Sequence, residues 1–398
     1  MSPHPTAGGE RLELLDALRG FALLGVLLVN LRDLTLFDLL PAAEAALLPT
    51  APLDRGLSIA FAALIDGKAF TVFTVLFGVG FALQMQRATD AGHHMRRYVR
   101  RLLVLLVIGL VHGLLWWGDI LRFYAVLGLL LVPLWRLNAR TLAWLGFAVA
   151  VTLTPFLRPL MNASLPAIAP APEATATALA AFRSENIGVM LAGNLSHDLW
   201  SRISAWGLPF YVLGRLLIGA ALGKSGALQD GPARLQFWGR LLFLLLPIGI
   251  ALTTFLILRE HGLIGFTTGW WRSESARGLL RMVRSAAPLA LGLAYVAAFV
   301  LAFQHAGWGR WLRWFAPVGR MALTNYLAQT LIGLAIFYGI GFGIGPRFGL
   351  VGIVATAAVI FAVQIFASRW WLARYHFGPV EWVWRSLTYG TRPPMCRH

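Results

Sequence analysis

The chain has 398 residues, of which 58% are hydrophobic and 13% charged, and its formal net charge is +17. A soluble domain has roughly twice that charged fraction, so the composition excludes an ordinary soluble enzyme. The basic residues lie in short segments between apolar runs, so we expect no nucleic-acid partner. Cys396 is the single cysteine, which excludes a disulfide framework and a thiolate metal site, and we expect no bound metal.

Apolar runs long enough to cross a bilayer recur along the whole chain. They predict an all-α fold, a polytopic transmembrane bundle of about ten spans. The second run is longer than one span, so we expect a turn followed by a helix from about residue 68. The predicted spans are 15–35, 58–84, 100–117, 120–136, 141–158, 203–222, 238–258, 285–304, 320–340 and 349–368.

The distribution of arginine predicts the orientation, because positive residues favour the cytoplasmic side of a membrane. The segment 86–101, "QRATDAGHHMRRYVRR", contains five arginines and is placed inside, which puts both termini inside as well. The segment 259–284 also contains five arginines but falls outside in this arrangement. Its Trp270 and Trp271 predict that it lies along the membrane interface.

The connection 160–202 divides the chain and begins with a Pro- and Ala-rich stretch, so we expect an extracytoplasmic loop. Residues 1–159 form a half of five spans, and residues 203–398 form a second half with an amphipathic cytoplasmic tail, within one membrane domain. The halves show no sequence repeat, which argues against an inverted-repeat transporter. In the tail, the spacing predicts an ion pair between Glu381 and Arg385.

Polar and charged side chains recur at the predicted outer ends of several spans. They are Asn30, Arg32, Asp33, Asp66, Lys68, His112, Asp119 and Arg122. Charges at that depth are unfavourable unless they face a cavity or a partner, so we expect these groups to converge on one cavity. Seven residues separate His112 from Asp119, which places them on one helix face unless Gly118 interrupts the helix.

Arg19 and Asn30 are separated by eleven residues in the first span. Three helical turns therefore place them on one face, about 16 Å apart along the axis. Asp16 lies three residues before Arg19, so a neutralised pair at the cytoplasmic end is the structural alternative. Near the C-terminus, Asn325 and Gln329 share a helix face and either bond a neighbouring helix or line the same cavity.

Arg215 lies well inside its span, too far from either end to reach the interface easily, so we expect it to point into a cavity. The other charged residues each have a structural interpretation as well. Asp66 with Lys68, and Asp119 with Arg122, are spaced as ion pairs that fix turns at the headgroup level. A single membrane histidine commonly bonds a neighbouring helix. The functional interpretation depends on the convergence of these groups.

Five blocks of the sequence resemble a known family. They are "LLDALRGFALLGVLLVN", "IDGKAFTVFTVLFGVGFALQMQRA", "HGLLWWGDILRFYAVLG", "GRMALTNYLAQTLI" and "FGPVEWVWRSLTYG". In this order they resemble the signature blocks of the YeiB-like family of bacterial inner-membrane proteins, the domain-of-unknown-function family 418. The resemblance covers nearly the whole chain and implies a multi-pass protein of the bacterial cytoplasmic (inner) membrane.

The first block is also distantly similar to the opening helix of two groups of membrane acyltransferases. These are the acyltransferase-3 family and the heparan-alpha-glucosaminide N-acetyltransferase group. The similarity implies transfer of an acyl group from cytoplasmic acyl-CoA, such as acetyl-CoA, to an extracytoplasmic sugar or lipid-linked acceptor. The acyltransferase-3 pattern has His where this chain has Asn30. The heparan-alpha-glucosaminide N-acetyltransferase pattern keeps its catalytic His in the outer loop after this helix, but residues 31–65 contain no His. Neither group's catalytic His is therefore present.

For such an O- or N-acyltransferase, His112 is the predicted base and Asp119 its orienting partner. Asn30 would donate to the thioester oxyanion, and Arg19 and Arg215 would bind the cosubstrate. We expect acyl-CoA as a cosubstrate and no permanently bound cofactor. The expected surroundings are the lipid bilayer, an envelope glycan or lipid-linked acceptor and, in a homodimer, a second copy of the chain. The alternatives are a transporter or exporter of a small solute, which uses the same charges without covalent chemistry, and a non-catalytic subunit.

Overall fold

Helices make up nearly all of the part of the chain that the structure describes. The structure is a computed structural model, and it describes residues 7–86, 91–165, 168–228, 232–264, 269 and 273–397. In these residues the extended backbone is limited to one isolated bridge between Tyr375 and Cys396. The predicted all-α fold is therefore confirmed. Trp270 and Trp271, which predict an interfacial segment, lie outside the described residues.

The elements follow one another with short connections. The α-helices are α1 (Ala7–Leu34), α2 (Ala42–Ala45), α3 (Ala51–Leu64), α4 (Lys68–Gln86), α5 (Ala91–Leu115), α6 (Leu121–Leu134), α7 (Ala139–Phe147), α8 (Thr154–Ser164), α9 (Ala171–Phe182), α10 (Ile187–Ser204), α11 (Leu208–Lys224), α12 (Pro232–Glu260), α13 (Glu274–Gln304), α14 (Ala306–Leu312), α15 (Ala316–Arg320), α16 (Ala322–Phe337), α17 (Leu350–Arg374) and α18 (Pro379–Tyr389). Short 3₁₀ segments, η1 (Phe37–Leu39) and η4 (Arg313–Phe315), and a π-helical segment, η2 (Ala148–Leu153), complete the described elements.

Seven predicted spans each coincide with one main helix. The other three cover consecutive segments: α3 and α4 for 58–84, α7, η2 and α8 for 141–158, and α10 and α11 for 203–222. In the described residues, seven helices are long and apolar enough to cross a membrane, or up to eight if the bent pair α10 and α11 is one span. The shorter apolar helices α6 and α16 coincide with two further predicted spans. The structure is therefore that of an integral membrane protein, and the number of ten crossings stays a prediction.

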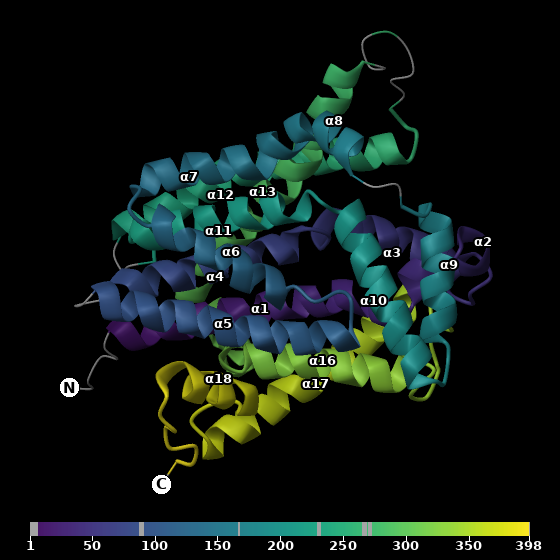
Figure 1. The fold of residues 1–398 in the computed structure, drawn as a ribbon. Helices are drawn as coiled ribbons and strands as arrows, with labels where there is room; N and C mark the ends of the chain where they lie inside the picture. Colours follow the sequence, from purple (N-terminus) through teal and green to yellow (C-terminus); the bar gives the residue numbers. More distant parts are fainter. Residues whose placement is uncertain are drawn as a thin grey trace.

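The long helices lie side by side in a bundle, with α4 above α1 and α16 and α17 below it (Figure 1). Helix α1 contacts α4, α15, α16 and α17, while α11 contacts α4 and α7. Leu23, Leu27, Leu31 and Leu34 form a stripe on α1 with no exposed surface. Because i and i+4 positions share a helix face, this stripe explains why α1 occupies the centre.

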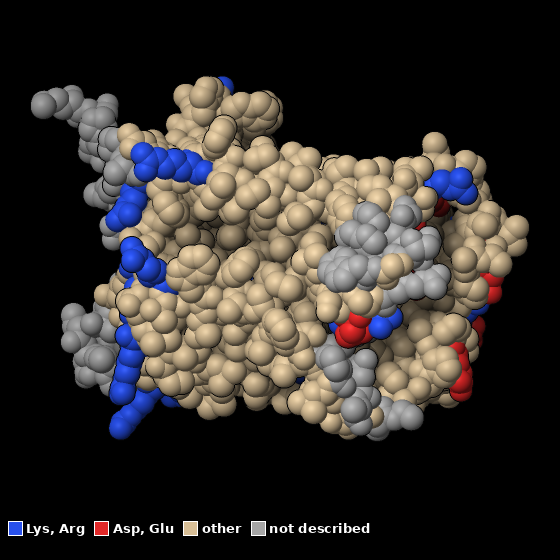
Figure 2. Space-filling model, turned by 90° about the horizontal axis from the view of Figure 1, so that it is seen from above, with Lys and Arg blue, Asp and Glu red and all other residues tan. Residues whose placement is uncertain are grey.

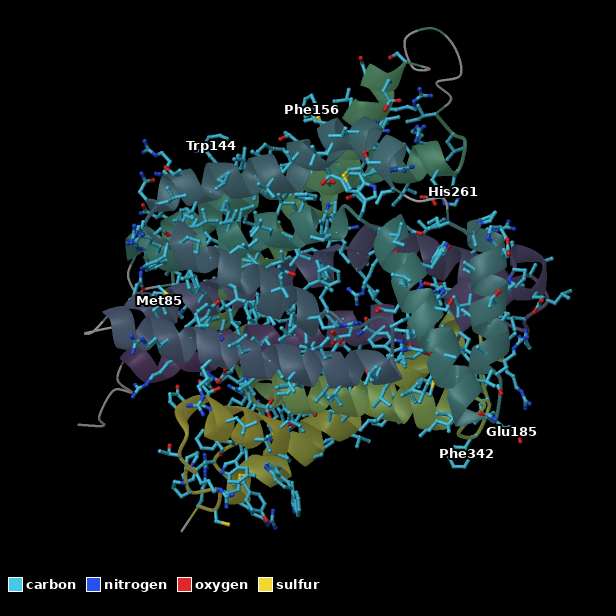
Figure 3. All side chains as sticks on the ribbon, viewed as in Figure 1. Met85, Trp144, Phe156, Glu185, His261 and Phe342 are labelled. Carbon is cyan, nitrogen blue, oxygen red and sulfur yellow. The ribbon has the colours of Figure 1, made fainter. Side chains whose placement is uncertain are left out.

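The two ends of the bundle differ in charge. Both termini lie at one end, and Lys and Arg side chains gather there on the face seen in Figure 2, while Asp and Glu appear toward the opposite end. Met85 and Glu185 mark the two ends in Figure 3. Trp144 and Phe156 point outward from α7 and α8 and are 68% and 76% exposed, as expected of side chains that contact lipid (Figure 3).

Helices α4 and α11 approach each other closely at two glycines. A Cβ atom at Gly78 would overlap the carbonyl oxygen of Leu216, and one at Gly219 would overlap the carbonyl oxygen of Val75. Small residues at such crossings let helix backbones pack against each other in a membrane. This contact fixes α11 against the centre of the bundle.

The segment 160–202, predicted to be an extracytoplasmic loop, is mostly helical in the described residues, and its side of the membrane stays a prediction. It contains the end of α8, all of α9 and most of α10. Ala favours helices, and Pro172 lies in the first turn of α9, where a missing N–H is tolerated. Asn186 caps α10 by accepting hydrogen bonds from Gly188 N at 2.8 Å and Val189 N at 3.2 Å. The segment thus brings α10 against the bundle before a bend of 71° into α11.

Candidate functional site

A cavity of about 720 Å³ follows the inner face of α1. Its walls come from α1, α4, α5, α6, α10, α11, α15, α16 and α18, and it extends from Arg19 to Asn30 and Asp33. The eleven residues between Arg19 and Asn30 correspond to about 16 Å along the helix axis. The predicted single face of α1 therefore lines one continuous space, which we call the central cavity.

One end of the central cavity is basic. Four arginines from four different helices line it, and we call them the basic end: Arg19, Arg101, Arg320 and Arg385. Asp16 pairs with Arg19 at 3.0 Å, as the structural alternative for these two residues predicts. Arg101 stacks on Trp384 with its Cζ 4.2 Å from the ring centre. With only Asp16 and Glu381 as carboxylates beside four arginines, this end favours an anionic group.

Glu381 does not pair with Arg385, and that prediction is wrong. The Glu381 carboxylate accepts hydrogen bonds from the backbone N–H groups of Leu323 at 2.7 Å and Thr324 at 3.0 Å, in the first turn of α16. An acceptor there satisfies N–H groups that have no partner inside the helix. Burial raises the pKa of Glu381, and the hydrogen bonds from Thr324 partly offset that rise. Arg385 instead stacks on Phe377 at 4.6 Å.

Aromatic rings line the cavity between its ends. Phe70, Phe73 and Phe77 recur on one face of α4, with ring centres 6.5, 5.9 and 5.1 Å from that of Tyr124. The Tyr124 hydroxyl hydrogen-bonds the Thr74 hydroxyl at 2.9 Å. This middle section therefore presents ring faces rather than charges to whatever occupies the cavity.

The opposite end is lined by three carboxylates and an amide, together with the guanidinium of Arg202. We call the first four residues the acidic end: Asn30, Asp33, Asp119 and Asp198. Asn30 and Asp33 are three residues apart on α1 and therefore share a face. Neither side chain hydrogen-bonds any residue that the structure describes, although the Asp33 backbone carbonyl accepts from Leu36. Asp33 is thus the one carboxylate lining the cavity, among the described residues, without a hydrogen-bond donor.

Asp119 and Asp198 belong to a buried hydrogen-bonded chain. His112 bridges Thr330 Oγ1 at 2.9 Å through Nε2 and Asp119 Oδ1 at 2.8 Å through Nδ1. Arg122 donates to Asp119 at 3.0 Å through Nε and to Asp198 at 3.1 Å through each of its terminal nitrogens. Gly113 leaves the space for this guanidinium, because a Cβ there would overlap it. These hydrogen bonds link helices α16, α5, α6 and α10.

The predicted contact between His112 and Asp119 is confirmed, with a different geometry. Helix α5 ends at Leu115, and the turn that follows brings Asp119 back to His112. Asp119 also accepts from the N–H groups of Leu121 at 3.2 Å and Arg122 at 3.1 Å, which caps α6. His112 is 5% exposed, both its ring nitrogens are bonded and it does not line the cavity. Its geometry therefore fits an orienting role and not that of a base in contact with substrate.

The charges at the end of α1 pair differently from the prediction. Asp66 accepts from Arg32 at 3.2 Å, and Arg32 also donates to Asp38 at 3.0 Å. Lys68 donates to the carbonyl oxygen of Ala62 instead of pairing with Asp66, and it does not line the cavity. Arg32, Asp66 and Lys68 thus fix the connections around the acidic end without facing the cavity.

Arg215 does not point into the central cavity, and that prediction is wrong. Its side chain has no exposed surface and donates to Thr71 Oγ1 at 2.8 Å, Tyr211 O at 3.0 Å and Ser285 O at 3.3 Å. These three acceptors come from α4, α11 and α13, so the guanidinium joins three helices. A cosubstrate-binding role for Arg215 has no support in this geometry.

Asn325 and Gln329 bond a neighbouring helix, which is the first of the two alternatives that the sequence predicts for them. Asn325 donates to Ser368 at 3.0 Å, and Gln329 donates to Gln364 at 2.9 Å, so both bond α17. Neither residue lines the central cavity. They act as interhelical hydrogen bonds between α16 and α17.

Sequence reasoning missed several residues that line the cavity. Asp198 and Arg202 lie four residues apart on α10, with bonds of 3.0 and 2.8 Å, a spacing that is visible in the sequence. A loop is predicted for this segment, so the sequence does not indicate that the two residues share a helix face. Arg101 counts in the sequence only as a positive residue that sets the orientation, and Arg320 is not singled out. Their convergence depends on helix packing that spacing alone does not give.

Membrane-length helices around a long cavity with charged ends define an integral membrane protein with an internal cavity. The chain is 31% identical over 405 residues to the uncharacterized protein YeiB of Escherichia coli (strain K12), with 97% of this chain and 98% of that protein covered. It is 30% identical over 427 residues to the uncharacterized protein YxaH of Bacillus subtilis (strain 168), with 100% and 98% covered. Residues 222–391 match the family model described as "Protein of unknown function (DUF418)".

The chain therefore belongs to the DUF418 family of YeiB-like proteins, as the sequence blocks predict. No solved structure gives a significant match. The more distant similarity to membrane acyltransferases stays a prediction.

Proposed function

We propose that this protein is an acyltransferase of the bacterial cytoplasmic membrane. It would transfer an acyl group from cytoplasmic acyl-CoA to an extracytoplasmic sugar or lipid-linked acceptor. The observation that carries the proposal is the central cavity, which joins four arginines at one end to Asn30 and Asp33 at the other. The concentration of Lys and Arg at the end with both termini supports an orientation with that end in the cytoplasm (Figure 2).

The cavity suits the parts of an acyl-CoA molecule in their order. Its phosphates carry several negative charges, and arginine forks bind phosphate oxygens in pairs. The aromatic middle section suits the less polar pantetheine arm. About 16 Å separates Arg19 from Asn30 along α1, which is of the same order as the extended arm. The thioester would then lie beside Asn30 and Asp33.

The chemistry needs a base and a donor to the thioester oxygen. Asp33 would accept the proton of the acceptor hydroxyl or amine as its oxygen or nitrogen attacks the thioester carbonyl carbon. The new bond forms and the carbon–sulfur bond breaks, and protonated Asp33 then returns the proton to the departing thiolate. Asn30 would donate a hydrogen bond to the carbonyl oxygen during the attack. Asp33 thus replaces His112 as the base, because it lines the cavity without a donor of its own.

The test uses the full chain in nanodiscs with acetyl-CoA labelled in the acetyl group and an envelope lipid and glycan extract as acceptor. We expect label transfer with release of one thiol per acetyl group. Asp33→Asn should lower the rate by about 10²–10⁴, the usual contribution of a general base. Glu185→Gln is the matched control and should keep the rate, since Glu185 is exposed and does not line the cavity. Full activity of a folded Asp33→Asn variant would exclude Asp33 as the base.

The same cavity favours a second function, movement of a small solute, because it extends between the two ends of the bundle. Uptake or efflux of solutes by proteoliposomes without acyl-CoA tests this alternative. Solute movement together with an absence of label transfer would support a transporter over an acyltransferase.

A further inference from the structure

A second cavity, of about 690 Å³, opens at the end of the bundle that carries the termini. It lies between the start of α1, the α14–α15 segment and the end of α17. Its charged lining consists of Arg310, Arg313, Arg320 and Arg369 with Glu13 and Asp16. It shares only Asp16 and Arg320 with the central cavity.

The carboxylates of this second cavity are already paired. Glu13 accepts from Arg313 at 3.2 Å, and Asp16 accepts from Arg19 at 3.0 Å. Arg310 and Arg369 also line the second cavity, and both are exposed. Neither donates a hydrogen bond to a residue that the structure describes. Arg369 is held in place by stacking on Trp314, with its Cζ 3.9 Å from the ring centre. Two guanidinium groups, of which Arg369 is positioned by this stacking, therefore remain available for an anion.

An apolar stripe on α17 leads to this cavity. Val359, Val363, Phe366 and Trp370 are 64%, 60%, 65% and 56% exposed. Their spacing of four, three and four residues puts them on one face of a membrane-length helix. Phe366 contacts Trp314 with ring centres 6.4 Å apart, so the stripe ends at the second cavity.

Tryptophans place the second cavity at the level of lipid headgroups. Trp308 and Trp311 on α14 are 65% and 69% exposed and lie beside it in the chain. Tryptophan is enriched where the hydrocarbon core of a membrane meets water. The guanidinium groups of Arg310 and Arg369 thus sit where phosphates of the bilayer are found, above an apolar surface that suits acyl chains.

We propose that the second cavity binds the phosphodiester headgroup of an anionic phospholipid, such as phosphatidylglycerol or cardiolipin. Arg310 and Arg369 hold the phosphate, and the acyl chains lie along the Val359–Trp370 face of α17. Basic pockets between membrane helices on the cytoplasmic side are suited to such headgroups. The apolar stripe selects a bilayer lipid over a soluble phosphate. This site is separate from the proposed acyl-transfer chemistry.

The test measures lipid binding to the full chain in detergent, by native mass spectrometry and by the shift of Tm. The probes are phosphatidylglycerol, phosphatidylcholine and inorganic phosphate. We expect phosphatidylglycerol to bind and to raise Tm, and the other two to have little effect. The double variant Arg310→Gln/Arg369→Gln should bind phosphatidylglycerol at least about tenfold more weakly than the unaltered protein, since each arginine near an anionic headgroup contributes substantially to binding.

The matched control is Arg136→Gln/Arg140→Gln, which removes two exposed arginines outside the second cavity. It should bind phosphatidylglycerol as the unaltered protein does, and both double variants should keep the lipid-free Tm. Equal phosphatidylglycerol binding by the two double variants would overturn the proposal. Stabilisation by inorganic phosphate as large as that by phosphatidylglycerol would also overturn it, because the ligand would then be a soluble anion.

Discussion

Replacement of Asp198 by Asn tests whether a buried ion pair holds α10 against the bundle. Asp198 is 7% exposed and accepts two hydrogen bonds of 3.1 Å from Arg122 and bonds of 3.0 and 2.8 Å from Arg202. Removing one partner of a fully buried pair costs about 3–5 kcal/mol. The loss here should lie at the lower end of that range, because the Arg122 side chain is 16% exposed and keeps its bond to Asp119. The Arg202 side chain is 29% exposed and regains water, so its bond to Asp198 contributes at most about 1 kcal/mol.

We therefore expect Asp198→Asn to lower the free energy of unfolding by about 3 kcal/mol. Arg202→Gln should lower it by at most about 1 kcal/mol. The assay is equilibrium unfolding in mixed micelles, followed by tryptophan fluorescence. A double-mutant cycle of Asp198→Asn with Arg122→Met isolates the pair and should give a coupling energy of about 2 kcal/mol or more. Equal losses for Asp198→Asn and Arg202→Gln, with a coupling energy near zero, would refute this reasoning.

Three further predictions concern packing, pH and a buried cation. Gly78→Val should destabilise the fold by about 1–3 kcal/mol through overpacking, while Gly239→Ala, with open space around its Cβ, should leave Tm unchanged or slightly higher. Burial raises the pKa of Glu381 above its ordinary value of 4.5. The stability that Glu381 contributes to the folded protein is therefore present below pH 4.5 and is lost as the pH rises through the raised pKa. The Tm of the unaltered protein should thus fall with rising pH in that window relative to Glu381→Gln, and parallel Tm curves would contradict this. Arg215→Met should lower stability without changing acetyl-CoA affinity, and a loss of affinity in a folded variant would restore the predicted binding role.

The sequence predicted only part of the convergence of polar groups. Asn30, Asp33 and Asp119 line one cavity, as expected of polar groups that must face a partner or a polar space in a membrane. The other groups that were expected there bond their neighbours and do not line the cavity: Arg32, Asp66, Lys68, His112 and Arg122. The failures concern side chains whose direction depends on packing between distant helices. Arg215 fills a contact between three helices, and His112 lies behind Asp119 with both nitrogens bonded.

The part of the charged network that lies on α10 was not predicted from the sequence, for a different reason. Asp198 lies in a segment whose Pro- and Ala-rich beginning predicts a loop. The alanine-rich α9 forms a helix where a tertiary surface is available, and α10 has a partly buried partner in Arg122. The i,i+4 spacing of Asp198 and Arg202 was the local signal that could have indicated a helix.

Binding of acetyl-CoA to the central cavity is the most direct test of the account. A ligand that binds only the folded state stabilises it by about 2.7 kcal/mol at a concentration of 100 times Kd. We expect acetyl-CoA to raise the Tm of the purified protein in nanodiscs, and Arg19→Gln/Arg101→Gln to abolish most of that shift. The Arg136→Gln/Arg140→Gln control should keep it. The account is contradicted if no acyl-CoA shifts the Tm of the unaltered protein, or if the variant without Arg19 and Arg101 shifts equally.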